Sequence, residues 1–291
     1  MKKYIFTFLL LFLACSVIAQ KRVVPTQEQI ARVERTTTNI VLTGENMLLE
    51  AALRSAVEKN WTITPVTFID NEEFLENIED ANRTFLLLVN GTFKKDKSQS
   101  NYIFLNFLMG GATTIDELSD FILLPLACSE NDEDLAILFM NAYVNIVQQH
   151  LKLLQEKPKQ ARAELDTYNS GIDKLTGRQI VMHRSAIAYD VTDGEIVELF
   201  NNNISFVTDL EMEHAVNTQA KNKVAAITLF PDNEQSGGYC YNLLIACDTH
   251  ELLYFKRHKI RGNNQSGFLK EELKRISIPF RDKKGIPFIN L

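Results

Sequence analysis

Two hydrophobic periodicities alternate along the chain and predict alternating strands and helices. Residues 39–42 are predicted as an opening strand, residues 63–69 have the apolar alternation of a strand, and the run FLLLV at 85–89 is apolar throughout, as in a strand covered on both faces. Between the first two segments, apolar residues recur at helical spacing. These positions are Leu48, Leu49, Ala52, Leu53, Ala56 and Val57.

A further apolar strand is expected at 103–108, before Gly110 and Gly111. These glycines indicate a tight turn, because no glycine-rich phosphate-binding motif surrounds them. Thr114 and Glu117 have the spacing of a capping box, which predicts a helix after this turn.

The same order of elements recurs in the second half of the chain. Segments 39–42, 66–69, 85–90 and 103–108 resemble 179–182, 204–207, 225–230 and 239–244, at separations of 136 to 140 residues. This internal repeat aligns Asn106 with Asn242. We therefore expect an α/β protein of two similar three-layer units, each a mixed sheet with helices.

A long helix is expected to join the two units. It begins near Ser129, where an acidic segment favours a helix N-terminus, and its apolar face continues to Leu154. A second helix is predicted over 160–168.

The last part of the chain predicts a β-hairpin, with strands at 239–247 and 251–260 around a turn at Asp248. Lys256, Arg257 and Lys259 place positive charge on the outer strand, a common protection of a sheet edge. The first unit shows no such hairpin in its sequence pattern. An extended tail is expected to close the chain, because Pro279 and Pro287 disfavour a helix there.

The first residues have the pattern of an export signal. Lys2 and Lys3 precede an apolar run from Tyr4 to Ala14, and the small-residue segment that follows predicts cleavage after Ala19 or Gln20. An uncleaved membrane anchor and lipidation of Cys15 are the alternative interpretations. The expected organisation is thus a signal peptide at 1–19, a first α/β unit at 20–127, a helical connector at 128–176, and a second α/β unit at 177–291.

Composition narrows the possible partners. Two of the 31 basic residues lie in the signal segment. The mature chain therefore has 29 basic and 37 acidic residues, a formal charge of −8. An acidic chain without a dense basic face does not favour nucleic-acid binding, and no apolar segment after the signal is long enough to span a membrane. The protein is therefore expected in the periplasm, with lipid anchoring through Cys15 or an extracellular location as alternatives.

No catalytic, cofactor-binding or metal-binding residues are predicted. The histidines are scattered, at positions 150, 183, 214, 250 and 258, and no HxH, HExxH or CxxC motif occurs. Glu211, Glu213 and His214 share a predicted helix, where a solvated face is favoured over a metal site. The sequence contains no GxSxG segment. Cys240 and Cys247 lie too far apart along one strand to pair, and packed free thiols are favoured, although a disulfide from Cys128 stays open.

Three polar or aromatic residues carry more specific expectations. Trp61, the one tryptophan, lies between the first helix and the next strand and is expected to fill the core there, with ligand stacking as the alternative. Asn106 and Asn242 lie inside apolar strands and require buried hydrogen-bond partners if they face inward. A structural network is favoured over a binding site for both.

One segment resembles a group of known proteins. Residues 59–74 (KNWTITPVTFIDNEEF), together with the end of the signal segment, resemble secreted proteins of the Bacteroidota that carry no assigned function. The resemblance implies periplasmic residence and no activity, cofactor or site residue. A second, fold-level similarity is to periplasmic α/β domains of envelope assembly proteins.

Two functional hypotheses follow. The first is a non-enzymatic periplasmic protein that binds a protein or another component of the cell envelope through an exposed sheet edge or the long helix. The second is a hydrolase or another small-molecule enzyme with its site between the two units. The absence of a catalytic motif favours the first hypothesis.

Overall fold

The computed structural model describes residues 22–128, 131–162, 164–232, 237–262 and 264–281. The expected signal segment 1–19 with Cys15, the expected helix cap at Ser129 and the tail from residue 282 lie outside these residues. No helix of the described residues is long and apolar enough to cross a bilayer.

The first unit contains a five-stranded mixed sheet in the order β2-β1-β3-β4-β5. Strands β1, β2 and β3 are parallel, and β4 and β5 are antiparallel to their neighbours. The strands are β1 (Thr37–Val41), β2 (Val66–Ile69), β3 (Arg83–Gly91), β4 (Tyr102–Met109) and β5 (Ser119–Ala127).

The second unit repeats this topology, with the order β10-β9-β8-β6-β7 and the same pattern of parallel and antiparallel pairs. Its strands are β6 (Gln179–Met182), β7 (Ile204–Phe206), β8 (Lys223–Leu229), β9 (Tyr239–Ala246) and β10 (Leu252–Lys259). The two similar α/β units expected from the internal repeat are confirmed.

The helices of the two units also correspond in chain order. The first unit has α1 (Gln27–Arg32), α2 (Met47–Asn60), α3 (Asn71–Asn77) and α4 (Asn131–Glu156), and the second has α5 (Asp193–Phe200), α6 (Asp209–Asn217) and α7 (Lys270–Ile276). Short 3₁₀ segments are η1 (Val33–Arg35), η2 (Ile115–Glu117), η3 (Pro158–Arg162), η4 (Glu164–Leu175), η5 (Arg184–Ala186) and η6 (Ile278–Phe280).

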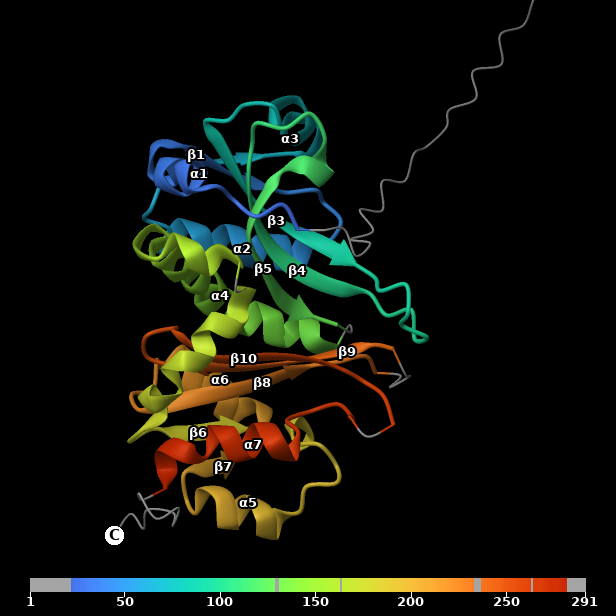
Figure 1. The fold of residues 1–291 in the computed structure, drawn as a ribbon, viewed down its shortest axis with the longest axis vertical. Helices are drawn as coiled ribbons and strands as arrows, with labels where there is room; N and C mark the ends of the chain where they lie inside the picture. Colours follow the sequence, from blue (N-terminus) through green and yellow to red (C-terminus); the bar gives the residue numbers. More distant parts are fainter. Residues whose placement is uncertain (1–21, 129–130, 163, 233–236, 263, 282–291) are drawn as a thin grey trace, which may run out of the picture.

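The units stack so that non-equivalent faces meet. Helices α2 and α4 pack on the face of the first sheet that points to the second unit, and α3 packs on the opposite face. In the second unit α6 packs on the face toward the first unit, whereas α5 and α7 cover the far face. Since α2 corresponds to α5 and α3 to α6, the units are arranged front to back (Figure 1).

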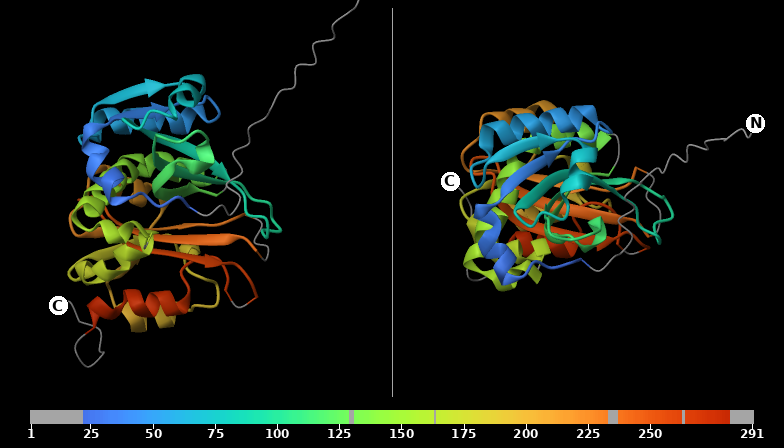
Figure 2. Two further views of the ribbon diagram at one scale, coloured as in Figure 1. Left: turned by 45° about the horizontal axis from the view of Figure 1, so that its top comes forward. Right: turned by 90° about the horizontal axis from the view of Figure 1, so that it is seen from above.

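Helix α4 lies at the centre of this stack. One hydrophobic cluster joins Leu105 of the first sheet, Phe139 and Tyr143 of α4, and Leu243 of the second sheet. Of the α4 side chains that are described, only Asp134, Lys152 and Glu156 are exposed. The tilted view on the left of Figure 2 shows the same stacking. The long helix therefore joins the units by filling the space between their sheets.

The helix predicted after Gly111 is wrong. Residues 115–117 form only the short turn η2, and β5 follows as a strand antiparallel to β4. Thr114 makes no side-chain capping bond. An apolar run buried on both faces has no helical or strand periodicity of its own, so the capping pattern was misleading. The sequence pattern predicts an antiparallel hairpin in the second unit only. The pair of β4 and β5 is its equivalent in the first unit.

Two smaller expectations also change. The helix predicted over 160–168 is a pair of 3₁₀ segments, η3 and η4. In α2, Leu49, Leu53, Ala56 and Val57 are buried, but Leu48 is 69 % exposed. Leu48 lies beside the buried stripe of the helix and does not belong to it.

Candidate functional sites

The histidines do not form a metal centre. The described residues contain no group of three or more His, Cys, Asp or Glu side chains that could hold a metal ion. His150 is buried on α4, between the Tyr168 hydroxyl at 3.1 Å and the Phe121 carbonyl at 3.2 Å. Burial lowers its pKa from 6.5 to about 4, which keeps the imidazole neutral.

The cysteines are packed thiols. Cys128, Cys240 and Cys247 are buried and form no disulfide. Burial raises the pKa of Cys128 far above its usual range and that of Cys247 to about 11, so both sulfurs stay protonated at neutral pH. A protonated, buried thiol is a poor nucleophile.

Asn242 lies at the centre of a buried polar cluster under α7. Its Oδ1 accepts a hydrogen bond from the Thr228 hydroxyl at 2.7 Å, and its Nδ2 donates to the Gly267 carbonyl at 3.0 Å and to Glu272 Oε2 at 2.8 Å. Gly267 has φ of 85°, and a side chain there would collide with the Ala186 carbonyl. The cluster ties the loop before α7 to the sheet, as expected of a structural network.

Glu272 is the unusual member of this cluster. Its Oε2 also accepts from the Leu269 backbone N–H at 2.8 Å, and its Oε1 lies 3.9 Å from Nδ1 of His258. Burial raises the pKa of Glu272 to about 7 and lowers that of His258. The two side chains therefore favour their neutral forms in the fold, and no cavity lies beside them among the hollows described below.

Asn106 does not occupy the position equivalent to Asn242. It lies opposite Leu87 on the α3 face of its sheet, whereas Asn242 lies on the face covered by α5 and α7. Since α3 corresponds to α6, the alignment of these two asparagines is shifted by one residue. The similarity of the two runs does not reveal such a shift, because nearly all their other positions are apolar or aromatic and match in either register.

Trp61 is half-buried and packs against the core. Its ring stacks on Phe107 with centroids 5.9 Å apart, and its Nε1 donates to the Thr64 hydroxyl at 2.9 Å. The tight turn expected at Gly110 and Gly111 is instead the start of a longer connection between β4 and β5, in which their N–H groups donate to the carbonyls of Arg83 and Ile78. A Cβ on Gly110 would lie 2.3 Å from the Asp80 carbonyl oxygen, so the backbone packs too closely there for another residue.

Of the four outer sheet edges, two are covered. Residue 23 covers β5, because the Asp120 N–H donates to its carbonyl at 2.8 Å. Asn169 of η4 covers β10 with two hydrogen bonds to the Phe255 backbone. The basic strand predicted as an edge is the last strand of its sheet, but η4 covers it.

Strand β2 forms an uncovered edge of the first sheet. In the parallel pair with β1, the Thr38 N–H donates to the Pro65 carbonyl and the Leu42 N–H to the Ile69 carbonyl. This register directs Thr67 and Ile69 to β1 and leaves the N–H and C=O groups of Val66 and Phe68 pointing outward. The strand contains no charged residue.

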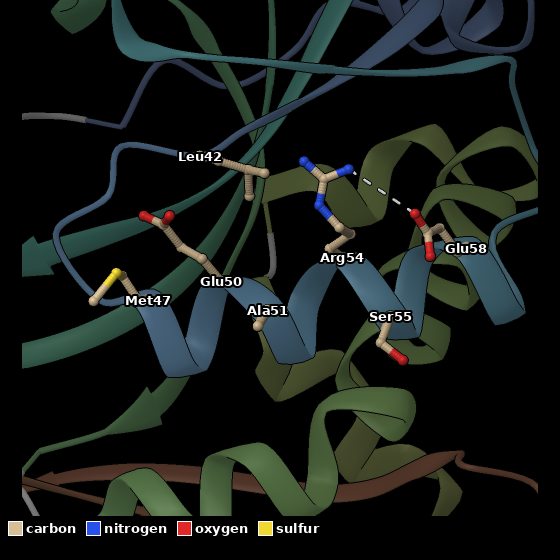
Figure 3. Close-up of a pocket in the computed structure, with 7 residues that line it drawn as sticks. All are labelled: Leu42, Met47, Glu50, Ala51, Arg54, Ser55 and Glu58. Carbon is tan, nitrogen blue, oxygen red and sulfur yellow. Dashed lines mark ion pairs between the residues drawn. The ribbon is translucent and has the colours of Figure 1, made fainter.

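A groove of about 310 Å³ lies beside this edge, along α2 (Figure 3). Met47 and Leu48 at the start of α2 are 77 % and 69 % exposed. The groove is lined by Leu42, Met47, Glu50, Ala51, Arg54, Ser55 and Glu58.

The two ends of the groove differ in chemistry. At the Met47 end, the Glu50 carboxylate accepts hydrogen bonds from the backbone N–H groups of Thr43 and Gly44 at 2.9 and 3.0 Å. The remaining open surface there is mainly apolar. At the other end, Arg54 lies 4.0 Å above the Phe68 ring and 3.9 Å from Glu58. The arginine partly shields the edge strand, and Arg54 and Glu58 carry the exposed charges of the groove.

The sequence offered one unused signal for this groove. Met47 is an apolar residue outside the apolar stripe of α2, at the first position of the helix. Its position in an amphipathic pattern predicts exposure, although it does not show that β2 lies uncovered nearby.

No family model, curated protein sequence or solved structure matches this chain.

Proposed function

We propose that this chain is a non-enzymatic binding protein of the bacterial periplasm, and that it binds an extended segment of another envelope protein along β2 and the α2 groove. The export-type signal segment supports the location. The observation that carries the binding role is an uncovered edge strand, β2, whose Phe68 lies under Arg54 of a groove that also contains the exposed Met47.

An extended segment fits this surface for two reasons. The outward backbone groups of Val66 and Phe68 offer the hydrogen bonds that an added strand requires. The groove beside them accepts apolar side chains of that strand at alternate positions, next to Leu42 and Met47. Methionine adapts its shape to different partners, which suits a surface that recognises a segment type.

Two other possibilities from the sequence have less support, namely binding through the long helix and an active site between the units. Helix α4 is buried between the sheets, so it offers little surface to a partner. The space between the units is occupied by packed side chains such as Phe139, Tyr143 and Tyr241, which weighs against an active site at that junction.

Binding can be measured with a fluorescent nine-residue peptide of alternating valine and threonine, titrated with the mature protein. Met47→Asp places a charge in the apolar end of the groove, and Val66→Pro removes an outward N–H without a bond to β1. Each substitution is expected to weaken peptide binding by about tenfold.

Matched controls exist in the second unit. Leu210 is 77 % exposed at the start of α6, as Met47 is on α2. Ile204 has the outward N–H of β7 that corresponds to Val66. Leu210→Asp and Ile204→Pro are expected to leave peptide binding unchanged. Equal losses in both pairs of variants, or no saturable binding by the wild-type protein, would refute the proposal.

A further inference from the structure

A second hollow, of about 220 Å³, lies in the other unit where strands β6, β7 and β8 begin. It is lined by Gly177, Arg178, Gln179, Asn202, Asn203, Lys221, Asn222 and Lys223. All three turns that lead into these parallel strands contribute to it. We call it the strand-start pocket.

The lining of this pocket is chemically uniform. It contains three cationic side chains, four amide side chains and a glycine, and it contains no carboxylate and no apolar side chain. The whole chain has 37 acidic against 31 basic residues, so this concentration of positive charge departs from its average. Such a set of donors suits an anion that accepts many hydrogen bonds.

Backbone hydrogen bonds hold the pocket walls in place. The Gln179 N–H donates to the Asn222 carbonyl and the Ile180 N–H to the Asn203 carbonyl, both at 2.8 Å. Gly177 and Asn222 have φ of 76° and 61°, which turn the chain sharply into β6 and β8. The pocket is therefore formed before any ligand arrives, which lowers the entropic cost of binding.

The charges of the pocket are unequally compensated. Arg178 forms an ion pair with Asp248 at 2.8 Å. Neither Lys221 nor Lys223 forms an ion pair with a carboxylate of the described residues. The pKa of Glu211 is lowered first by the hydrogen bonds from Thr208 and, as the last of its causes, by the charge of Lys223. Two lysine charges thus remain available to a ligand.

In the first unit, the cationic side chain at the position equivalent to Lys223 is Arg83, and it has partners within its own unit. Thr37 pairs with Arg83 as Gln179 pairs with Lys223. Arg83 donates to Asp80 at 3.2 Å and to Asn39 at 3.0 Å, so its charge is compensated inside the unit. Within the described part of the chain Lys223 has no such ion-pair partner, which distinguishes the second unit from the first.

We infer that the strand-start pocket binds a phosphate group. A phosphate monoester carries about −1.5 to −2 charge at neutral pH, which two uncompensated lysines match. Asn202 and Asn222 add neutral N–H donors at the rim. The volume is below the roughly 300 Å³ of a typical small-molecule site, so the pocket takes the phosphate end of a ligand. Free phosphate and a lipid headgroup share this chemistry.

The first experiment titrates the mature protein with inorganic phosphate at physiological ionic strength and follows the backbone amide signals of Gln179 and Asn222 by NMR. Saturable shifts are expected for the wild-type protein. The double variant Lys221→Gln/Lys223→Gln should weaken binding by about tenfold or more, because two charged hydrogen-bond donors are removed. Lys221 is exposed, so the single variant Lys221→Glu supplies a second test that leaves β8 unchanged.

The control is Lys94→Gln/Lys97→Gln, which removes two exposed lysines from the first unit and makes the same change in net charge. It should bind phosphate as the wild-type protein does. Equal weakening in both double variants, or no saturable shift in the wild-type protein, would overturn the inference.

The source of the phosphate is distinguished with vesicles that contain phosphatidic acid, whose headgroup is a phosphate monoester. If a lipid headgroup is the ligand, the protein sediments with these vesicles, inorganic phosphate competes, and Lys221→Gln/Lys223→Gln reduces sedimentation. If a soluble phosphate compound is the ligand, vesicles do not sediment the protein while inorganic phosphate still binds. Vesicle binding that is insensitive to phosphate and to the double variant contradicts a phosphate site in this pocket.

Discussion

The side-chain amide of Asn169 bonds both backbone polar groups of Phe255, with Nδ2 donating to the carbonyl oxygen and Oδ1 accepting from the N–H, each at 2.8 Å. One side chain thus supplies the two hydrogen bonds that a neighbouring strand would make at this position of β10. Asn169 is buried, so water does not replace it readily.

We predict that Asn169→Ala destabilises the protein by about 2–3 kcal/mol, because two buried backbone groups lose their partner. Urea unfolding of the variant and the wild-type protein measures this difference. The half-buried Asn77, whose solvent-exposed bond to the Glu73 carbonyl lies within α3, provides the control Asn77→Ala, with a loss below about 1 kcal/mol. Equal losses would show that the Asn169 bonds do not hold the edge.

Tyr102 connects the two units. Its hydroxyl accepts from the Tyr239 N–H at 2.8 Å and donates to the Tyr239 carbonyl at 3.2 Å. Tyr102→Phe should cost about 1–3 kcal/mol in the free energy of unfolding, since the aromatic ring remains but the N–H loses its acceptor. Tyr189→Phe removes a hydroxyl from a tyrosine that is 80 % exposed and should have no measurable effect. A neutral result for Tyr102→Phe would contradict a stabilising bond at this junction.

Glu272 should make the protein less stable as pH rises. Its pKa is raised from 4.5 to about 7 by burial, so between these values the folded state holds a proton that the unfolded state has lost. The stability from neutral Glu272 is complete below about pH 4.5 and is lost as pH rises through about 7, an effect on the order of 3 kcal/mol.

Glu272→Gln isolates this contribution, because glutamine keeps the shape and cannot ionise. Urea unfolding at pH 4.5 and pH 7.5 should show the variant gaining stability relative to the wild-type protein at the higher pH. A constant difference across this range would mean that Glu272 does not titrate as the structure indicates.

His150 should make the protein less stable as pH falls, which is opposite to the effect of Glu272. Burial lowers its pKa from 6.5 to about 4, so the unfolded state takes up a proton first as pH falls. The stability from neutral His150 is present above about pH 6.5 and is lost on the way down to about 4, again on the order of 3 kcal/mol. His150→Gln should remove this acid sensitivity, measured by thermal unfolding between pH 7 and 4.5, whereas substitution of the exposed His214 by Gln should retain it.

The hydrophobic pattern predicted much of the fold and little of the candidate sites. Each unit's parallel strands and the long helix follow from local periodicity, which depends on which side of an element faces the core. The pattern does not predict β5, because a strand buried on both faces shows no alternation. Thr114 and Glu117 moreover have the spacing of a helix cap. The sites were not visible, because the exposed edge of β2 and the charges around Lys221 and Lys223 depend on neighbours distant in sequence.

The amino-acid sequence alone determined an α/β chain of two similar halves with a long apolar helix between them, since burial of each apolar face dictates the local structure. Only the tertiary structure decided how the halves meet. Their stacking front to back buries α4 between the sheets and leaves β2 uncovered, and the strand pairing sets Asn106 and Asn242 on non-equivalent faces. These relations come from contacts between residues far apart in the chain, which no local pattern specifies.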